Sequence, residues 1–141
     1  MPSTRARAPH LRPALIAVVA AGGAVGTAAR EAVALAVPPV GGLPVAILAV
    51  NLAGAFVLGV LLEALQRRGP DEGGRRLLRL AAGTGFCGGF TTYSTLAVGA
   101  AELLRSGPAA LGAAYAVGSV LLGVAAAGLG VLVGATIGGR R

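Results

Sequence analysis

The chain is poor in charged residues and in the side chains that build metal sites and disulfides. Of its 141 residues, 12% are charged and 55% are hydrophobic, with one cysteine, one histidine and no tryptophan. One cysteine excludes an internal disulfide, and one cysteine with one histidine cannot form a zinc or haem ligand set. Soluble domains of this length seldom show such a balance. The composition therefore favours a membrane protein.

Four apolar runs account for most of the chain, at residues 14–37, 45–65, 77–104 and 109–134. Each run is long enough to cross a bilayer as a helix, and proline and glycine fall between the runs. We predict an all-α integral membrane protein with four transmembrane helices. The predicted organisation is a basic tail (1–13), one four-helix domain (14–137) and a second basic tail (138–141). Four spans leave no room for a soluble catalytic domain, so we do not expect an enzyme.

The N-terminal residues allow one alternative. Arg5, Arg7 and Arg12 precede an apolar run, as in the charged region of a signal peptide. A leader cleaved near residues 22–29 would leave Arg30 and three further spans without a partner helix. We therefore prefer four spans.

All twelve basic residues are arginines, and they are distributed unevenly. With four spans, the two termini and the middle loop share one side of the membrane and hold ten arginines, whereas the other side holds only Arg30 and Arg105. An excess of arginine marks the cytoplasmic side. We expect a multi-pass protein of the bacterial cell membrane with cytoplasmic termini. Arginines clustered between apolar runs argue against nucleic-acid binding, although they are compatible with lipid headgroups.

The third run concentrates helix-breaking and hydroxyl residues near its middle. Gly83, Gly85, Gly88 and Gly89 are followed by Thr91, Thr92, Ser94 and Thr95. We predict that this third helix is broken near its middle, because irregular backbone at that depth must line a polar cavity or be buried in protein. Its freed carbonyl groups make a natural cation site. The glycines also satisfy GxGxxG, but the strand and acidic residue of a dinucleotide site are lacking.

Isolated polar residues lie on the other runs. Asn51 needs a partner, because burying its amide without one costs about 1–3 kcal/mol. A hydrogen bond between helices and a pore-lining role are both open for Asn51, and Ser119 can also bond back to its own helix. Together Asn51, Ser94, Thr95 and Ser119 offer amide and hydroxyl donors without an ionised residue among them. Such a lining suits a small anion.

Three segments resemble the CrcB/Fluc family of fluoride channels: GGAVGTAAR at 22–30, VNLAGAFVLG at 50–59 and GTGFCGGFTTYSTL at 83–96. The resemblance extends over all four runs, and the third segment is the most specific. It implies an antiparallel dimer with two narrow pores and a structural Na⁺ held by the backbone carbonyls of Gly88 and Thr91. It also implies that the ion pathway involves Arg30, Asn51, Tyr93, Ser94, Thr95 and Ser119.

Two positions depart from the family pattern TTFSTF, which has phenylalanine where this chain has Tyr93 and Leu96. Aromatic ring edges are electropositive and can coordinate an anion, so Tyr93 keeps this capacity and Leu96 does not. The arginine bias adds a second point, because it predicts one dominant orientation whereas the family dimer is antiparallel. Our hypothesis is a heterodimer with an oppositely oriented homologous chain, and a homodimer is the alternative.

We interpret the chain as a subunit of a fluoride-selective channel that exports cytoplasmic fluoride passively, with Na⁺ as a structural ion and not a driving ion. One alternative is a subunit of a small four-helix multidrug exporter. A proton-coupled exporter needs an acidic residue in mid-span, and Glu31, Glu63 and Glu102 all lie near the ends of runs. Another alternative is a non-conducting scaffold in which Asn51 and the hydroxyls only join helices.

Overall fold

The computed structural model describes residues 12–139, which are mostly helical and contain no β-strand. Arg5, Arg7, His10, Arg140 and Arg141 lie outside the described residues. The elements are α1 (Pro13–Ala36), α2 (Val45–Arg67), α3 (Gly73–Leu78), the π-helical stretch η2 (Arg79–Cys87), α4 (Gly88–Phe90), α5 (Tyr93–Ser106) and α6 (Ala109–Ile137).

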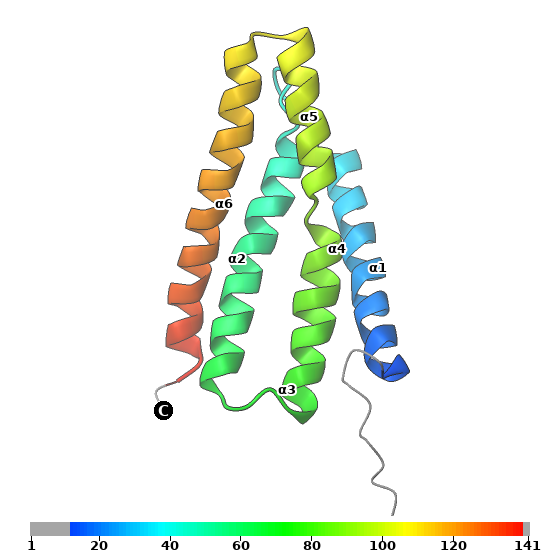
Figure 1. Cartoon of the computed structure of the whole chain (residues 1–141), viewed down its shortest axis with the longest axis vertical. Helices are drawn as coiled ribbons and strands as arrows, with labels where there is room; N and C mark the ends of the chain where they lie inside the picture. The colour runs from blue at the N-terminus through cyan, green and yellow to red at the C-terminus, as the bar shows by residue number, and fades with distance from the viewer. Residues whose placement is uncertain (1–11, 140–141) are drawn as a thin grey trace, which may run out of the picture.

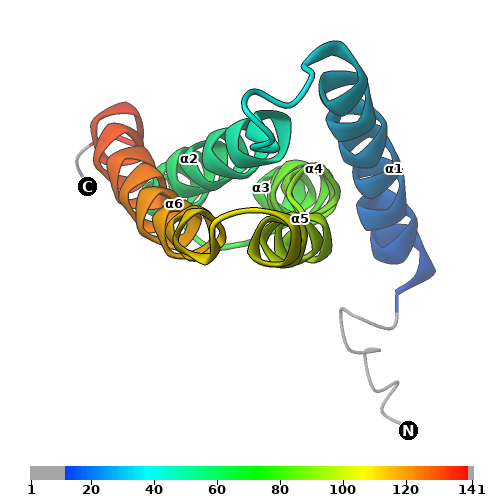
Figure 2. The same ribbon diagram turned by 90° about the horizontal axis from the view of Figure 1, so that it is seen from above.

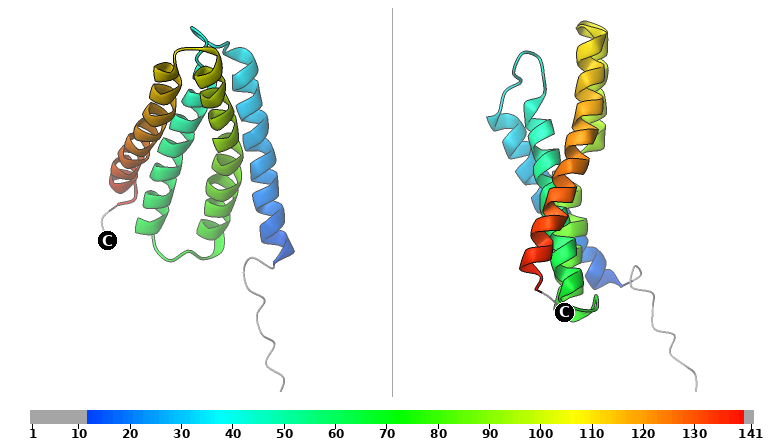
Figure 3. Two further views of the ribbon diagram at one scale, coloured as in Figure 1. Left: turned by 45° about the horizontal axis from the view of Figure 1, so that its top comes forward. Right: turned by 90° about the vertical axis from the view of Figure 1, so that its left-hand side faces the viewer.

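The helices form an elongated bundle whose long axis they follow (Figure 1). The segments α3, η2, α4 and α5 follow one another in a single column, which lies with α2 between α1 and α6. Seen from above, α1 stands on one side of this column and α6 on the other (Figure 2). From the side, α1 and α6 are inclined in opposite directions (Figure 3).

The connections alternate between the two ends of the bundle. The start of α1, the connection from α2 to α3 and the end of α6 lie at one end, and the other two helix connections lie at the opposite end (Figure 1). Among the described residues, the first of these ends holds six arginines: Arg12, Arg67, Arg68, Arg75, Arg76 and Arg79. We call it the arginine-rich end.

Three helices, α1, α2 and α6, are long and apolar enough to cross a membrane. Their bounds agree with three predicted runs to within three residues. Pro13, which we assigned to the N-terminal tail, is instead the first residue of α1, where its missing N–H leaves no helical hydrogen bond unmade. The third predicted run, 77–104, is divided among η2, α4 and α5, with α3 leading into it.

Close contacts between glycines and backbone hold α1 against the column. A Cβ atom on Gly22 would collide with the Ala81 carbonyl, and one on Gly26 would collide with the Phe86 carbonyl. Small residues four apart on a helix allow backbones to approach this closely. Gly59 and Gly130 make the equivalent close approach between α2 and α6. The small buried core, Ala100, Leu103 and Tyr115, joins α5 to α6.

Candidate functional site

Two threonines separate the helical segments of the third run. Helix α4 ends at Phe90, Thr91 and Thr92 have extended backbone, and α5 begins at Tyr93. The Thr91 N–H (3.0 Å) and its hydroxyl (2.9 Å) both donate to the Cys87 carbonyl, which closes the preceding helix. Thr92 then caps α5, since its Oγ1 accepts from the Thr95 N–H at 3.3 Å. We call residues 91–92 the interruption.

None of the glycines at 83–89 marks the point where the helical backbone stops, although Gly83 and Gly85 lie in the π-helical stretch η2. Gly88 and Gly89 lie within α4, and the Gly88 dihedral angles are ordinary helical values, φ −64° and ψ −36°. Gly89 allows a close approach instead, because a Cβ atom on it would collide with the Gly23 carbonyl of α1, whereas one on Gly88 would meet nothing within 4 Å. The backbone therefore leaves the helix two residues after the glycines, at the threonines.

The interruption frees backbone carbonyl groups. In a continuous helix the Thr92 and Thr95 N–H groups would donate to Gly88 and Thr91, but here they donate to the Asn51 and Thr92 side chains. Within residues 12–139, no hydrogen bond reaches the carbonyl oxygen of Gly88 or of Thr91. These two oxygens are therefore available to a cation.

Asn51 on α2 is hydrogen-bonded to the interruption through both ends of its amide. Its Nδ2 donates to the Thr92 carbonyl at 3.0 Å, and its Oδ1 accepts from the Thr92 N–H at 2.8 Å. Asn51 thus makes the hydrogen bond between helices that its burial requires. One of its two Nδ2 protons has no partner among the described residues and can still face an anion.

Three hydroxyl groups gather at the start of α5. The Thr92 Oγ1 lies 3.2 Å from the Ser94 Oγ and 3.1 Å from the Thr95 Oγ1. The structure therefore brings the predicted residues Ser94 and Thr95 together with Asn51, through Thr92. We had not selected Thr92 as a site residue, although a threonine three positions ahead of Thr95 is a typical helix cap.

A groove runs along this face of the chain. It has a volume of about 530 Å³ and is lined by residues of α2, η2, α4 and the interruption, together with Tyr93. The Tyr93 side chain is 83% exposed in the single chain. The groove includes Asn51, Gly88, Thr91 and Thr92 among its lining residues. Asn51 and the two residues with unpartnered carbonyls therefore line one open groove.

The remaining predicted residues lie elsewhere. Arg30 approaches from α1, where its Nε donates to the Gly89 carbonyl at 3.3 Å and the Thr27 hydroxyl donates to the same oxygen at 3.4 Å. Ser119 is buried in α6 and donates to the carbonyl of Tyr115 in its own helix at 2.6 Å. No hydrogen bond joins Ser119 to the interruption in the described part of the chain.

The side chain at position 96 packs inside the chain. Leu96 is partly buried against the core of Ala100, Leu103 and Tyr115. The Tyr115 hydroxyl is buried there without a hydrogen-bond partner among the described residues, and the sequence did not predict a role for it. A lone tyrosine in an apolar run is the only sequence signal that marks this position.

The chemistry of the groove excludes a carboxylate site. Residues 12–139 contain no group of three His, Cys, Asp or Glu side chains that could hold a metal ion. A cation at the interruption must therefore be held by oxygens that carry no formal charge, such as those of Gly88 and Thr91. Carbonyl oxygens are hard ligands that suit alkali and alkaline-earth ions.

The helices and the polar interruption define a small helical membrane protein. A family model described as "CrcB-like protein, Camphor Resistance (CrcB)" matches residues 17–131. The chain belongs to this CrcB family, and curated relatives that it matches are named fluoride-specific ion channels.

Three such relatives cover most of the chain. It is 48% identical over 132 residues to fluoride-specific ion channel FluC 2 of Leifsonia xyli subsp. xyli, which covers 94% of this chain and 91% of the relative. It is 50% identical over 113 residues to FluC 1 of Cutibacterium acnes, with 79% of each chain covered. It is 41% identical over 117 residues to FluC of Chlorobium phaeobacteroides, with 80% and 87% covered. The family is one of ion channels and not of enzymes, as predicted.

Proposed function

We propose that the chain is a subunit of a fluoride-selective channel through which fluoride leaves the cytoplasm passively. The names of its relatives support the choice of ion. The observation that carries the proposal is that Asn51 and Thr92 line a groove without a carboxylate, with the Ser94 and Thr95 hydroxyls 3.2 Å and 3.1 Å from the Thr92 Oγ1.

Fluoride is small and strongly hydrated, so a selective pathway must replace its water with closely placed hydrogen-bond donors. The free Nδ2 proton of Asn51 and one hydroxyl of the pair Ser94 and Thr95 are such donors, because the single Thr92 hydroxyl proton can serve only one of the pair and the other must donate to Thr92. Their positions are fixed because Thr92 is hydrogen-bonded to all three residues. Tyr93 adds a ring edge and a hydroxyl on the same face. Donors held in place do not have to reorganise when the ion arrives.

A structural Na⁺ fits the two unpartnered carbonyl oxygens, those of Gly88 and Thr91. When bound, the ion satisfies these oxygens and supplies a positive charge beside an anion pathway. Two carbonyls do not complete a coordination shell, and the same two oxygens of a second subunit would add to it. We propose that Na⁺ stabilises the interruption and does not drive transport.

The exposed groove also supports a dimer. Tyr93, Gly88 and Thr84 are exposed in the single chain, so the pathway is open to one side until another surface covers it. We propose that a subunit of opposite orientation provides this surface. The six described arginines at one end of the bundle favour a cytoplasmic location for that end and one dominant orientation. A homologous partner chain of opposite orientation would cover the open groove and would also be consistent with one dominant orientation of this chain. A homodimer is the alternative.

Ion efflux from liposomes tests the proposed function. Purified full-length protein is reconstituted with fluoride or chloride inside, and release is followed with ion-selective electrodes. We expect rapid fluoride release with chloride retained, either alone or after co-reconstitution with an oppositely oriented homologue. Release of both ions at similar rates, or silence under both conditions, would contradict the proposal. Silence with an intact assembly would favour the scaffold alternative.

The multidrug-exporter alternative predicts a different result. It requires proton-coupled uptake of organic cations, and the groove residues include no carboxylate to bind such a cargo. A pH gradient that drives organic cation uptake into the same liposomes would support the exporter. Passive fluoride release that is indifferent to a pH gradient would support the channel.

A further inference from the structure

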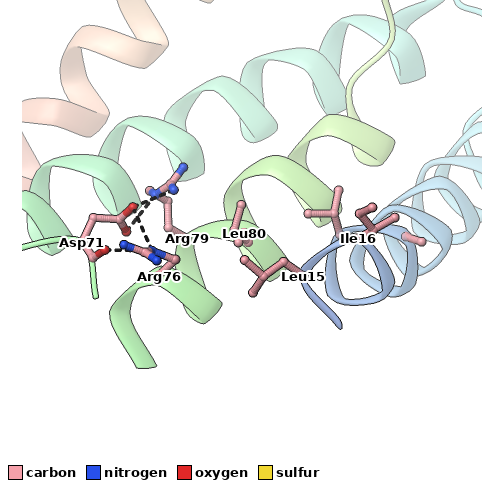
Figure 4. Close-up of a pocket in the computed structure, with 8 residues that line it drawn as sticks. Leu15, Ile16, Asp71, Arg76, Arg79 and Leu80 are labelled. Atoms are coloured by element: carbon pink, nitrogen blue, oxygen red, sulfur yellow. Dashed lines mark hydrogen bonds and ion pairs between the residues drawn. The ribbon is translucent and has the colours of Figure 1, made fainter. Parts of the chain in front are cut away.

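A second groove lies at the arginine-rich end, on the side of the column that faces α1 (Figure 4). Its volume is about 580 Å³. One wall comes from α1 and is apolar, with Leu15, Ile16, Val19 and Ala20. The other comes from the column and the connection before it, and is charged except for Leu80: Asp71, Arg76, Arg79 and Leu80. Ile16 is 55% exposed, so the apolar wall is open to the surroundings. In a membrane protein this combination marks the boundary between acyl chains and headgroups.

The charged wall has an unused binding capacity for an anion. Arg79 is held by Asp71 through two hydrogen bonds, of 2.9 Å and 2.7 Å. This contact keeps the pKa of Asp71 below its ordinary value, so the carboxylate stays ionised. Arg76 donates from its Nε to the Asp71 carbonyl oxygen at 2.9 Å, and the same Nε lies 3.8 Å from the Asp71 Oδ2. Its two terminal nitrogens have no hydrogen-bond partner among the described residues. A guanidinium in this state can bind a phosphate oxygen pair.

We propose that this groove binds an anionic phospholipid, with an acyl chain along Leu15 and Ile16 and the phosphate on Arg76. The charge of the site selects this occupant. Residues 67–79 hold five arginines against two acids, so a lipid with a net negative charge is favoured over a zwitterionic lipid. A soluble phosphate would leave the apolar wall uncovered.

Two other occupants fit the charge less well. Residues 1–11 of this chain contain Arg5, Arg7 and no acid, so they do not complement Arg76 and Arg79. A parallel second copy brings the same excess of arginine to this end, and an antiparallel copy brings its opposite end, where Arg30 and Arg105 balance Glu31 and Glu102. The proposal does not depend on fluoride permeation, and its test measures lipid contact without ion flux.

The absence of tryptophan gives the test a clean background. Leu15→Trp places a single fluorescent reporter on the apolar wall, in full-length protein reconstituted with brominated phosphatidylglycerol or brominated phosphatidylcholine as quencher. The matched control is Leu132→Trp on α6, which is 66% exposed and lies near the same end of the bundle. Arg76, Arg79 and Asp71 together carry one net positive charge. This predicts about a fivefold preference for phosphatidylglycerol at the groove and none at the control.

Charge variants in the Leu15→Trp background distinguish lipid binding in the groove from lipid attraction by the general surface potential. Arg76→Gln combined with Arg79→Gln should abolish the preference, whereas Arg105→Gln, at the opposite end, should leave it unchanged. Asp71→Asn should increase it, because Arg79 is released. If Leu15→Trp does not fold, Ile16→Trp on the same wall serves as the reporter.

Three results would overturn the lipid site. Equal quenching by the two lipids at the groove reporter would show that it has no headgroup selectivity. A preference that survives the double arginine variant would assign it to the surface potential. A groove reporter that neither lipid quenches, while the control is quenched, would show that protein occupies the groove.

Discussion

The side-chain amide of Asn51 is paired with the backbone of Thr92 through two hydrogen bonds, of 3.0 Å and 2.8 Å. The pair joins α2 to the interruption in the third run. The Thr92 N–H and carbonyl would otherwise lack partners at the point where the helix stops. Asn51 therefore stabilises the irregular backbone while presenting one free N–H on the groove.

Asn51→Ala should lower both stability and fluoride flux. The substitution leaves the Thr92 N–H and carbonyl without partners, and each unpaired group costs about 1–3 kcal/mol when water cannot reach it. We expect a fall in fluoride release of at least about tenfold, measured as electrode-detected efflux and normalised to protein that remains assembled. Thr136→Ala is the control, because the Thr136 hydroxyl is exposed and bonds only to its own helix. Unchanged flux in Asn51→Ala would remove Asn51 from the pathway.

Two substitutions of Thr92 distinguish the contribution of its hydroxyl group from that of its branched shape. Thr92→Val keeps the branched side chain but removes the oxygen that caps α5 and contacts Ser94 and Thr95. Loss of a helix cap costs about 1 kcal/mol, so we expect lower thermal stability and reduced flux. Thr92→Ser retains the oxygen and should stay close to the unmodified protein in both measurements. Equal behaviour of the two variants would show that the hydroxyl has no role.

The sequence predicted the helices better than it predicted the geometry within the third run. Hydropathy gave the bounds of α1, α2 and α6 to within three residues, because each is a long apolar segment between proline and glycine. It indicated irregular backbone near the glycines, yet Gly88 and Gly89 are helical and the extended residues are Thr91 and Thr92. The pattern of residue types does not reveal where the helix stops, because that position depends on Asn51, which is 41 residues from Thr92 in the sequence.

The predicted site residues also divide into those whose positions follow from the local sequence and those whose positions depend on packing. Residues close together in the sequence, such as Tyr93, Ser94 and Thr95, necessarily lie near one another at the start of α5. Ser119 is isolated, because its hydroxyl bonds to the Tyr115 carbonyl of its own helix, an alternative that composition cannot distinguish from a pore role. The position of Leu96, against the α5–α6 core, also depends on packing that no local pattern encodes.

Na⁺ should stabilise the assembled protein if the Gly88 and Thr91 carbonyls hold it. A ligand that binds only the folded state raises the free energy of unfolding by RT ln(1 + [L]/Kd), which is about 2.7 kcal/mol at a hundred times Kd. We expect the melting temperature in detergent to rise with Na⁺ concentration and not with N-methylglucamine at equal ionic strength. A melting temperature that follows ionic strength alone would contradict a specific Na⁺ site. Because melting is measured without flux, this outcome is independent of the ion that permeates.

The contact between α1 and the column predicts opposite effects for two alanine substitutions of glycine. Gly26→Ala places a Cβ atom against the Phe86 carbonyl, which is backbone of η2 and cannot turn aside as a flexible side chain can. Overpacking of this kind costs about 1–3 kcal/mol. Gly123→Ala on α6 is the matched control, because no atom lies within 4 Å of its added Cβ. Alanine is favoured over glycine in a helix by up to about 1 kcal/mol, so this variant should be unchanged or more stable.

The measurement is the melting temperature of each full-length variant in the same detergent. If Gly26→Ala melted at or above the temperature of Gly123→Ala, α1 would not be held against η2 as closely as these contacts require, and the approach of Arg30 to the Gly89 carbonyl would lose its structural basis.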